Sequence, residues 1–395
     1  MSKKFSIPFG GRGHWYTPEE LEIAQEVMKN AKTLTQGEHR DSFEKKFSEY
    51  AGVEHSFAVS NATMGSEIVA QLCLFKPGDE VIIPAHTFTS TAYPFVKAGA
   101  EIVWADIDAE TGCVTESTIR DRINEKTKAI VVTHLYGLCV EMPPIVELAK
   151  SNGLILIEDA AQALGAMYKG KMAGTFGDFG IFSFHSHKNV TTLGEGGMVV
   201  LKDSGMAEVV PQIRHNGHTT YSDTRLMYWK PAMSNLEIPK YQGQRIWPMN
   251  CCLGEVECAV GTKLIDRIDE INQKKRDRAI WFIDQLAEYS EIAFHRNSTK
   301  QHCYHLLIGQ MDIGKRDHFI QTMSDTYGIQ CIVQYCPLYR YPFYQEIGLS
   351  KHQCPNTDVF FDQMISFPFS HLLSDDQLFE VAQATKSTLG SREFS

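Results

Sequence analysis

The chain has 395 residues, 43% of them hydrophobic and 22% charged, a composition that is ordinary for a globular protein and excludes an intrinsically disordered one. This length exceeds what one hydrophobic core usually serves, so we expect a large domain at residues 1–262 and a small one at 263–395. The net charge of −10 argues against binding to nucleic acid or anionic membranes through bulk electrostatics.

The sequence carries no signal for export or membrane insertion. Its N-terminus lacks the apolar core of a signal peptide, and no stretch reaches the length of a membrane span. The ten cysteines form no C-x-x-C pair. Cys251, Cys252, His302 and His305 lack completing partners at zinc spacing. We therefore expect a cytoplasmic protein without a metal site.

The first predicted elements are a capped helix and a strand, turn and helix unit. Thr17 precedes a proline and two acidic residues, which is typical of a helix start. Residues 56–60 suit a short strand, and small residues at 61–66 lead into a helical stretch at 67–72. The turn offers free backbone N–H groups and a helix dipole to a phosphate, and Thr63 adds a hydroxyl. Taken singly, an ordinary capped helix explains this segment equally well.

Short apolar runs alternate with helical stretches through the first half of the chain. They span residues 81–83, 102–104, 129–133, 154–157 and 197–201. Such alternation predicts an α/β fold with a mostly parallel central sheet and flanking helices. The later part predicts a smaller α+β domain. Its expected elements are a long helix leading in at 253–286, a strand at 303–310, and helices at 315–327 and 375–388.

Two polar residues stand out after the buried run at 153–158. Asp159 ends that run, and strand carboxyl ends are where open α/β sheets bind ligands. Lys188 follows about one strand-loop-strand unit later, six residues before Gly194. Pyridoxal phosphate needs a carboxylate at its ring nitrogen and an amine for its aldehyde carbon. An acid after a strand is often only a helix cap and most lysines are solvated, so the combination carries this prediction.

A long polar and aromatic segment runs from Arg214 to Asn250. Segments of this length without clear periodicity are often functional loops. It carries Tyr228, Lys240 and Arg245, which we expect to help bind an anionic or polyhydroxylated substrate. A dimer-contact loop whose charges are solvated is an equal alternative.

Several stretches resemble the DegT/StrS family of pyridoxal phosphate-dependent sugar aminotransferases. They read GDEVIIP at 78–84, HLYG at 134–137, EDAAQ at 158–162 and GTFGDFG at 174–180. The resemblance extends through most of the chain and implies the fold type I aminotransferase architecture. It further implies a homodimer in which each subunit completes the other's site.

The resemblance assigns roles to particular residues. Lys188 would hold pyridoxal 5'-phosphate as an internal aldimine, and Asp159 would pair with the pyridine nitrogen. Gln162 would lie by the phenolic oxygen, and Phe88 would stack on the ring. His185 matches a frequent family residue on the phenolic side.

The resemblance also implies a phosphate site. Ala62, Thr63 and Ser183 would hold the phosphate, and Asn250 would reach across from the partner subunit. The implied reaction moves an amino group from L-glutamate, or glutamine, to an oxo-sugar. The freed lysine amine would carry the proton in both half-reactions, as general base and then acid.

Departures from the family pattern concern the substrate more than the cofactor. Cys252 stands where the family commonly has arginine, and Gln334 and Tyr339 stand where nucleotide-sugar members tend to carry histidine. The Pro-Leu-Tyr-Arg form at 337–340 is similar to members that aminate free cyclitols or unactivated sugars. An oxidised octulosonate for lipopolysaccharide is one such acceptor, and a nucleotide-linked keto-sugar is the alternative.

Two other functions are alternatives to transamination. One branch of the family has histidine in place of the aldimine lysine and dehydrates its sugar. Here the position is Lys188, so transamination is favoured. A regulator that keeps the fold without catalysis is the third interpretation, and the intact acid and lysine argue against it.

Overall fold

A seven-stranded sheet forms the centre of the computed structural model, which describes residues 5–10, 13, 15–219, 235–351, 353–370 and 372–391. The strand order is β1-β9-β8-β5-β4-β2-β3. Only β9 runs against its neighbours in this sheet, so the predicted mostly parallel sheet is confirmed. The strands are β1 (His55–Val59), β2 (Glu80–Pro84), β3 (Glu101–Ala105), β4 (Thr127–Thr133), β5 (Ile155–Asp159), β8 (Phe179–Ser183) and β9 (Gly197–Leu201).

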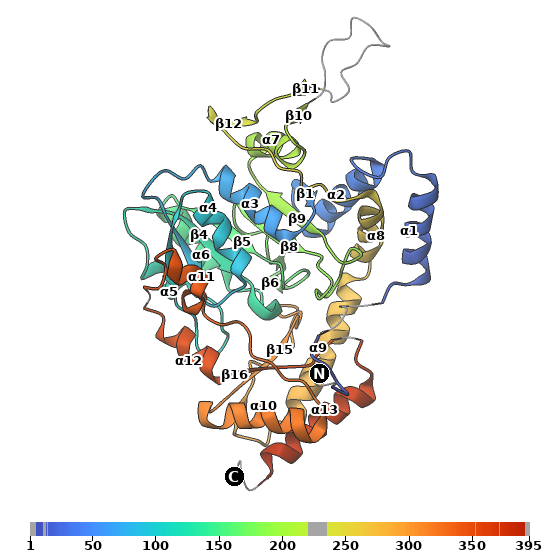
Figure 1. The fold of residues 1–395 in the computed structure, drawn as a ribbon, viewed down its shortest axis with the longest axis vertical. Helices are drawn as coiled ribbons and strands as arrows, with labels where there is room; N and C mark the ends of the chain where they lie inside the picture. The colour runs from blue at the N-terminus through green and yellow to red at the C-terminus, as the bar shows by residue number, and fades with distance from the viewer. Residues whose placement is uncertain are drawn as a thin grey trace, which may run out of the picture.

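Helices cover both faces of this sheet because its strands are apolar on both sides (Figure 1). Successive residues alternate between two clusters: Val132 belongs to the cluster that contains Phe47 on one face, and Val131 to the cluster that contains Ile68 on the other. The helices on the Phe47 face include α2 (Glu38–Ala51), α5 (Glu116–Arg120) and α6 (Met142–Ser151). Those on the Ile68 face include α3 (Ala62–Leu72), α4 (Tyr93–Lys97) and α7 (Ser204–Arg214).

The first helix, α1 (Pro18–Asn30), begins where the sequence predicts. The Thr17 hydroxyl accepts from the Glu20 N–H at 3.2 Å, and the Glu20 carboxylate accepts from the Thr17 N–H at 2.9 Å. This reciprocal pair satisfies two N–H groups that a helix start would leave free. The cap therefore fixes where the chain enters this helix, which packs beside α8 (Glu255–Ile265).

The predicted helix over 253–286 is two helices, α8 (Glu255–Ile265) and α9 (Ile268–Gln285). The break lies at Arg267, the N-cap of α9, whose φ of −109° and ψ of −3° depart from ideal helix values. The Arg267 guanidinium donates to Glu20 of α1 at 2.6 Å. This contact between distant segments accompanies a break that local periodicity could not predict.

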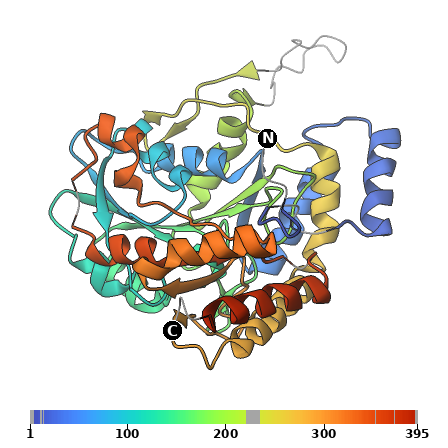
Figure 2. The same cartoon turned by 60° about the horizontal axis from the view of Figure 1, so that its bottom comes forward.

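A second, three-stranded antiparallel sheet lies below the first and is reached through α9 (Figure 1). Its strands are β14 (Ile292–Ala293), β15 (Leu307–Met311) and β16 (Met364–Phe367). Helices α10 (Ile313–Tyr327) and α13 (Asp375–Leu389), in front in Figure 2, confirm two predicted helices. They pack with α9 and this sheet around a third apolar cluster. The division at 262/263 falls inside α8 and stays a prediction.

The strand expected at 303–310 begins four residues later, at Leu307. Its expected first residues bind the large sheet's loops instead: the Cys303 N–H donates to the Gly137 carbonyl at 2.9 Å, and the Leu306 N–H to the Tyr136 carbonyl at 3.2 Å. The backbone turns at Tyr304, which has a φ of +46°. This segment therefore joins the two sheets.

The remaining elements are short. They are the antiparallel strand pairs β6 (Met167–Tyr168) with β7 (Lys171–Met172), β10 (His218–Thr219) with β11 (Asn235–Leu236) and β12 (Lys240–Tyr241) with β13 (Gln244–Arg245), and the helices η1 (Thr89–Thr91), η2 (Leu135–Gly137), η3 (Leu338–Arg340), α11 (Pro342–Glu346) and α12 (Pro355–Gln363). None of the helices that the structure describes is both long and apolar enough to cross a bilayer.

Candidate active site

A cavity of about 930 Å³ opens at the carboxyl edge of the large sheet, where β4, β5 and β8 end. It brings together every predicted cofactor residue except Asn250. These are Ala62, Thr63, Phe88, Asp159, Gln162, Ser183, His185 and Lys188. Segments far apart in the sequence thus meet in one place.

Asp159 is the last residue of β5 and is 9% exposed. The Thr91 hydroxyl donates to its Oδ2 at 2.6 Å, and the Ala161 N–H donates to its Oδ1 at 3.1 Å. These bonds fix the carboxylate as an acceptor at the cavity wall. Each oxygen keeps a further lone pair for a ligand N–H.

The preceding residue, Glu158, points to the opposite side and is fully buried. His134 Nε2 lies 2.8 Å from its Oε2, and the N–H groups of Gly174 and Gly177 donate to it at 2.8 and 2.6 Å. These hydrogen bonds make Glu158 an anchor for the loop behind the site. Sequence reasoning gave Glu158 no role, although the alternation of side chains at the strand end separates it from Asp159.

Lys188 lies in the loop after β8, half-buried at the cavity wall. Burial lowers the pKa of its amine to about 8, and the negative charge of Asp159 acts in the opposite direction. A substantial fraction of the amine is neutral near that pH and able to attack a carbonyl carbon. Gly13 passes over this loop, and its N–H donates to the Ser186 carbonyl at 2.8 Å. A Cβ at Gly13 would lie 1.7 Å from the Lys188 carbonyl oxygen, so glycine is needed there.

The small-residue turn is the first turn of α3, which begins at Ala62, five residues earlier than expected. Asn61 caps it, accepting from the Met64 N–H at 3.0 Å. The first N–H groups of a helix have no partner within the helix and attract anions. A Cβ at Gly197 of β9 would lie 2.7 Å from the Ala62 nitrogen, so glycine lets β9 pass beneath this helix start.

Gln162 and Phe88 face the cavity beside a tyrosine that sequence reasoning did not select. Gln162 Oε1 accepts from the Tyr136 N–H at 2.8 Å, and its Nε2 donates to the Tyr335 hydroxyl at 3.2 Å. Phe88 is 50% exposed, with the Tyr335 ring edge-on at 6.0 Å. Burial raises the pKa of Tyr335 to about 12, so its hydroxyl stays protonated near neutral pH. Tyr335 is distant in sequence and matches the family pattern, whereas Gln334 and Tyr339 around it depart from that pattern.

The two histidines before Lys188 lie at the cavity wall. His185 is partly buried, and its Nε2 lies 3.9 Å from a Glu195 carboxylate oxygen. His187 is exposed and packs edge-on against His185 at 5.1 Å. Partial desolvation of the ring lowers the pKa of His187, and the charges of His185 and Lys188 act in the same direction.

The predicted substrate residues are not part of this wall. Lys240 and Arg245 are exposed on the β12–β13 hairpin, outside the cavity lining. Asn250 is also exposed and pairs with His215 in a single bridge. Tyr228 lies outside the described residues.

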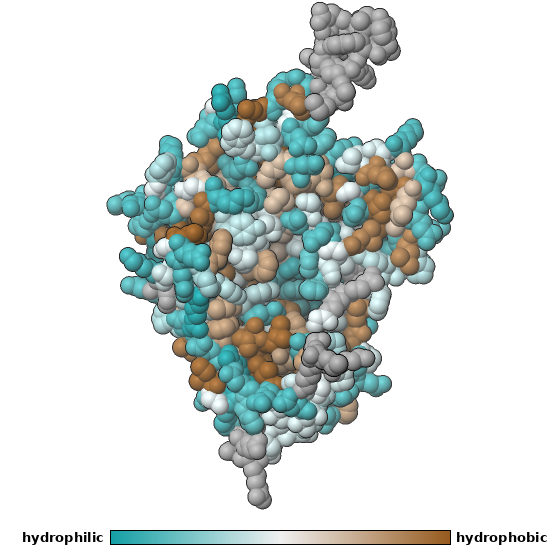
Figure 3. All heavy atoms as spheres, in the orientation of Figure 1, coloured by the Kyte–Doolittle hydropathy of each residue, from teal (hydrophilic) through white to brown (hydrophobic). Residues whose placement is uncertain are grey.

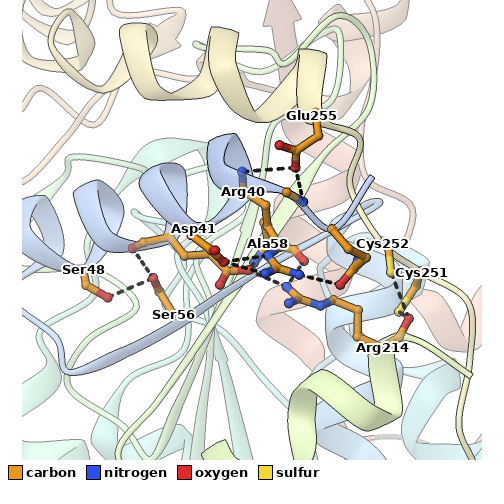
Figure 4. A network of polar contacts seen from close by, with 12 residues as sticks. Arg40, Asp41, Ser48, Ser56, Ala58, Arg214, Cys251, Cys252 and Glu255 are labelled. Atoms are coloured by element: carbon orange, nitrogen blue, oxygen red, sulfur yellow. Dashed lines mark hydrogen bonds and ion pairs between the residues drawn. The ribbon is translucent and has the colours of Figure 1, made fainter. Parts of the chain in front are cut away.

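The segment beside Asn250 is anchored by a buried polar network (Figure 4). Arg214, 2% exposed, pairs with Glu44 and donates to the Ala58 carbonyl at 2.7 Å. The Arg214 carbonyl accepts from the Cys251 N–H at 3.0 Å and from the Cys252 thiol at 3.4 Å. Cys252 therefore packs against the backbone and does not line the cavity.

The segment from Gln334 to Arg340 divides at the cavity edge. Gln334 and Tyr335 line the cavity, whereas Arg340 does not. Arg340 Nε donates to Asp358 at 2.9 Å and its Nη1 to Asp362 at 3.1 Å. Arg340 thus ties η3 to α12, and this part of the segment gives no information about the acceptor.

The cavity residues fit pyridoxal phosphate. The oriented carboxylate matches the ring nitrogen, and the partly neutral amine matches the aldehyde. The helix start matches the phosphate, and the open aromatic face matches the ring. Among the described residues, no group of three or more His, Cys, Asp and Glu gathers where a metal ion would be held.

Comparisons with known proteins agree with this chemistry. The sequence profile of the DegT/DnrJ/EryC1/StrS aminotransferase family matches residues 16–386. SpsC, a spore coat polysaccharide biosynthesis protein of Bacillus subtilis, is 29% identical over 97% of this chain and 96% of its own. GDP-perosamine synthase of Escherichia coli O157:H7 is 30% identical, over 93% and 95%. The structure of Helicobacter pylori PseC, an aminotransferase involved in pseudoaminic acid biosynthesis, is 25% identical over 98% and 99%, with a TM-score of 0.87.

Proposed function

Because the chain belongs to the DegT/DnrJ/EryC1/StrS aminotransferase family, we propose that it moves an amino group from L-glutamate to an oxo-sugar, with Lys188 and Asp159 as the catalytic residues. The protein is a pyridoxal phosphate-dependent sugar aminotransferase. One observation carries the residue assignment: the Lys188 amine and the Asp159 carboxylate line the same cavity.

The residues divide the work according to their chemistry. Bound pyridoxal phosphate supplies an electron sink and a carrier for the amino group. The Lys188 amine would hold the cofactor between turnovers and would move the proton to and from the donor's α-carbon. Asp159 keeps the proton on the ring nitrogen. The Thr63 and Ser183 hydroxyls and the start of α3 hold the phosphate.

We propose an acceptor without a nucleotide, such as an oxidised octulosonate of lipopolysaccharide synthesis or a free cyclitol. Gln334 supports it, since this residue lines the cavity in place of the histidine that nucleotide-sugar members tend to carry. The similarity to GDP-perosamine synthase favours the second candidate, a nucleotide-linked keto-sugar. Both acceptors fit the same reaction class.

A two-step experiment tests this function. L-glutamate added to the purified enzyme should abolish the absorbance of the lysine-linked cofactor and release one equivalent of 2-oxoglutarate. The resulting amino form is then offered a panel of oxo-sugars, and the true acceptor should restore the absorbance and gain nitrogen. We expect the highest kcat/KM for an acceptor without a nucleotide.

Each of the other possible results would contradict a different part of the proposed function. A higher kcat/KM for a nucleotide-linked keto-sugar would overturn the acceptor, and a stronger response to glutamine would overturn the donor. A product that loses oxygen without gaining nitrogen would indicate a dehydratase. A protein that responds to no amino donor would be a regulator.

We further propose a homodimer that completes each site from the partner subunit. Asn250, Lys240 and Arg245 lie outside their own cavity, so a role at the site requires a neighbouring chain. Hydrophobic side chains also gather on the face that carries α1 (Figure 3). Of the apolar residues of α1, Leu21 is 48% and Met28 68% exposed.

Light scattering at working concentration should therefore give about twice the chain mass of 44.6 kDa. The Arg245→Ala variant should keep this mass and lose affinity for the acceptor. Full activity in a protein that is monomeric at assay concentration would refute the shared site.

A further inference from the structure

A second lysine lines the same cavity as Lys188. Lys275 lies on α9 and is only 4% exposed. Among the described residues that line this cavity, Lys188 and Lys275 are the two lysines, and none is an arginine. If Lys188 is committed to the cofactor, Lys275 is the ammonium group left for a substrate.

The Lys275 amine is oriented by neutral partners. Its Nζ donates to Asn189 Oδ1 and to the His305 carbonyl, both at 3.0 Å, and lies 5.2 Å from the Phe369 ring centroid. The Asn189 amide is itself oriented, because its Nδ2 donates to Asn272 Oδ1 at 2.9 Å. Since Asn189 directly follows Lys188 in the chain, the Lys275 amine is hydrogen-bonded to the residue next to Lys188.

Lys275 has no counter-ion within the described part of the chain, where none of its contacts is an ion pair. Removing an ammonium from water without a paired charge is costly. Burial is the main cause that lowers the pKa of Lys275 to about 7; Cys303 acts in the opposite direction, and the positive charge of Arg278 acts with burial. A bound anion would supply the missing partner.

His305, next to Lys275, carries a second polar group that lacks a partner among the described residues. This histidine is 6% exposed and lines the cavity, and its Nδ1 has no hydrogen-bond partner among the described residues. Burial and the charges of Lys188 and Lys275 hold its pKa well below the usual range, so the ring is neutral near pH 7. A neutral ring protonated at Nδ1 can donate one hydrogen bond to an anion.

We propose that Lys275 and His305 form the subsite that binds a carboxylate of the amino-acid donor. This inference rests on the proposed function, in which the donor is glutamate. Every α-amino acid carries a carboxylate next to the carbon that reacts, so the active site needs a cation near the Lys188 amine. A charge-assisted bond to Lys275 supplies it. Lys275 and His305 act here as positioning residues for the donor.

The test measures binding of glutarate, a dicarboxylate without an amine, to the cofactor-loaded enzyme by calorimetry. Lys275→Gln removes the charge and keeps an N–H group for the neighbouring carbonyl oxygens. We expect glutarate affinity to fall about tenfold or more, as for loss of a bond to a charged group. The KM for glutamate should rise, while the rate at saturation changes less. Lys275→Arg should recover part of the affinity.

Lys274→Gln is the matched control, since this neighbouring lysine on α9 is exposed and lies outside the cavity lining. It should leave glutarate affinity unchanged. Gluconate distinguishes a carboxylated acceptor: if its binding depends on Lys275 and glutarate binding does not, the donor assignment is overturned. Unchanged glutarate affinity in Lys275→Gln overturns the subsite.

These outcomes are separable from failure of the proposed function. If only the subsite is wrong, the Lys275→Gln enzyme keeps the lysine-linked absorbance and the wild-type KM for glutamate. If the function itself is wrong, glutamate leaves the absorbance of the wild-type enzyme unchanged. A melting temperature for each variant shows whether it folds, and Lys275→Met provides a second neutral variant.

Discussion

Replacing Lys188 by alanine is expected to remove the absorbance of the lysine-linked cofactor and to lower transamination by about 10³-fold or more. The reason is that one amine both holds the cofactor and moves the proton. The side chain lines a cavity and is not packed in the core, so the variant should fold. An absorbance scan and a single-turnover reaction with glutamate measure both effects.

The matched control is Lys202→Ala. Burial lowers the pKa of Lys202 as well, yet this amine donates to the Phe176 carbonyl at 2.6 Å and lies outside the cavity. Its loss should leave the cofactor spectrum unchanged. Wild-type turnover by Lys188→Ala would refute the assignment.

Replacing Asp159 by asparagine is expected to lower the rate by about 10²- to 10³-fold, as for loss of one oriented electrostatic partner. Asparagine keeps the size of the side chain but cannot hold the proton on the ring nitrogen as a carboxylate does. Because Lys188 is intact, the lysine-linked absorbance should persist. The Lys188→Ala and Asp159→Asn variants should therefore differ in the absorbance spectrum of the cofactor as well as in rate.

Asp106→Asn separates this effect from loss of a buried carboxylate in general. Asp106 is also 9% exposed, but it accepts from Thr357 and does not line the cavity. This variant should lose stability and keep its rate per folded molecule. An Asp159→Asn enzyme as fast as wild type would show that the acid does not serve the ring nitrogen.

The central sheet and its polar edge were predictable because their signals are local. A buried strand ending in an acid has a recognisable pattern, and parallel strands bring their carboxyl ends to one edge. Asp159 and Lys188 indeed line one cavity. The start of α3 was misplaced because small residues suit both a turn and a capped first turn of helix.

Features set by distant contacts were not predictable from the sequence. The break at Arg267 accompanies a bond to Glu20, nearly 250 positions away in the chain. Lys275 lies on a helix whose periodicity gives no sign that this amine is buried. His305 meets it only because the chain at 303–306 leaves the strand to reach the large sheet. Long-range packing created this cluster.

Reduction of the enzyme with borohydride, followed by mass spectrometry of its peptides, tests the central claim most directly. Among the described residues, Lys188 and Lys275 are the two lysines that line the cavity, so the position of the label distinguishes them. We predict the cofactor on the peptide that contains Lys188 and none on the peptide that contains Lys275. Label on Lys275, or on no lysine, would contradict the assignment of the catalytic amine.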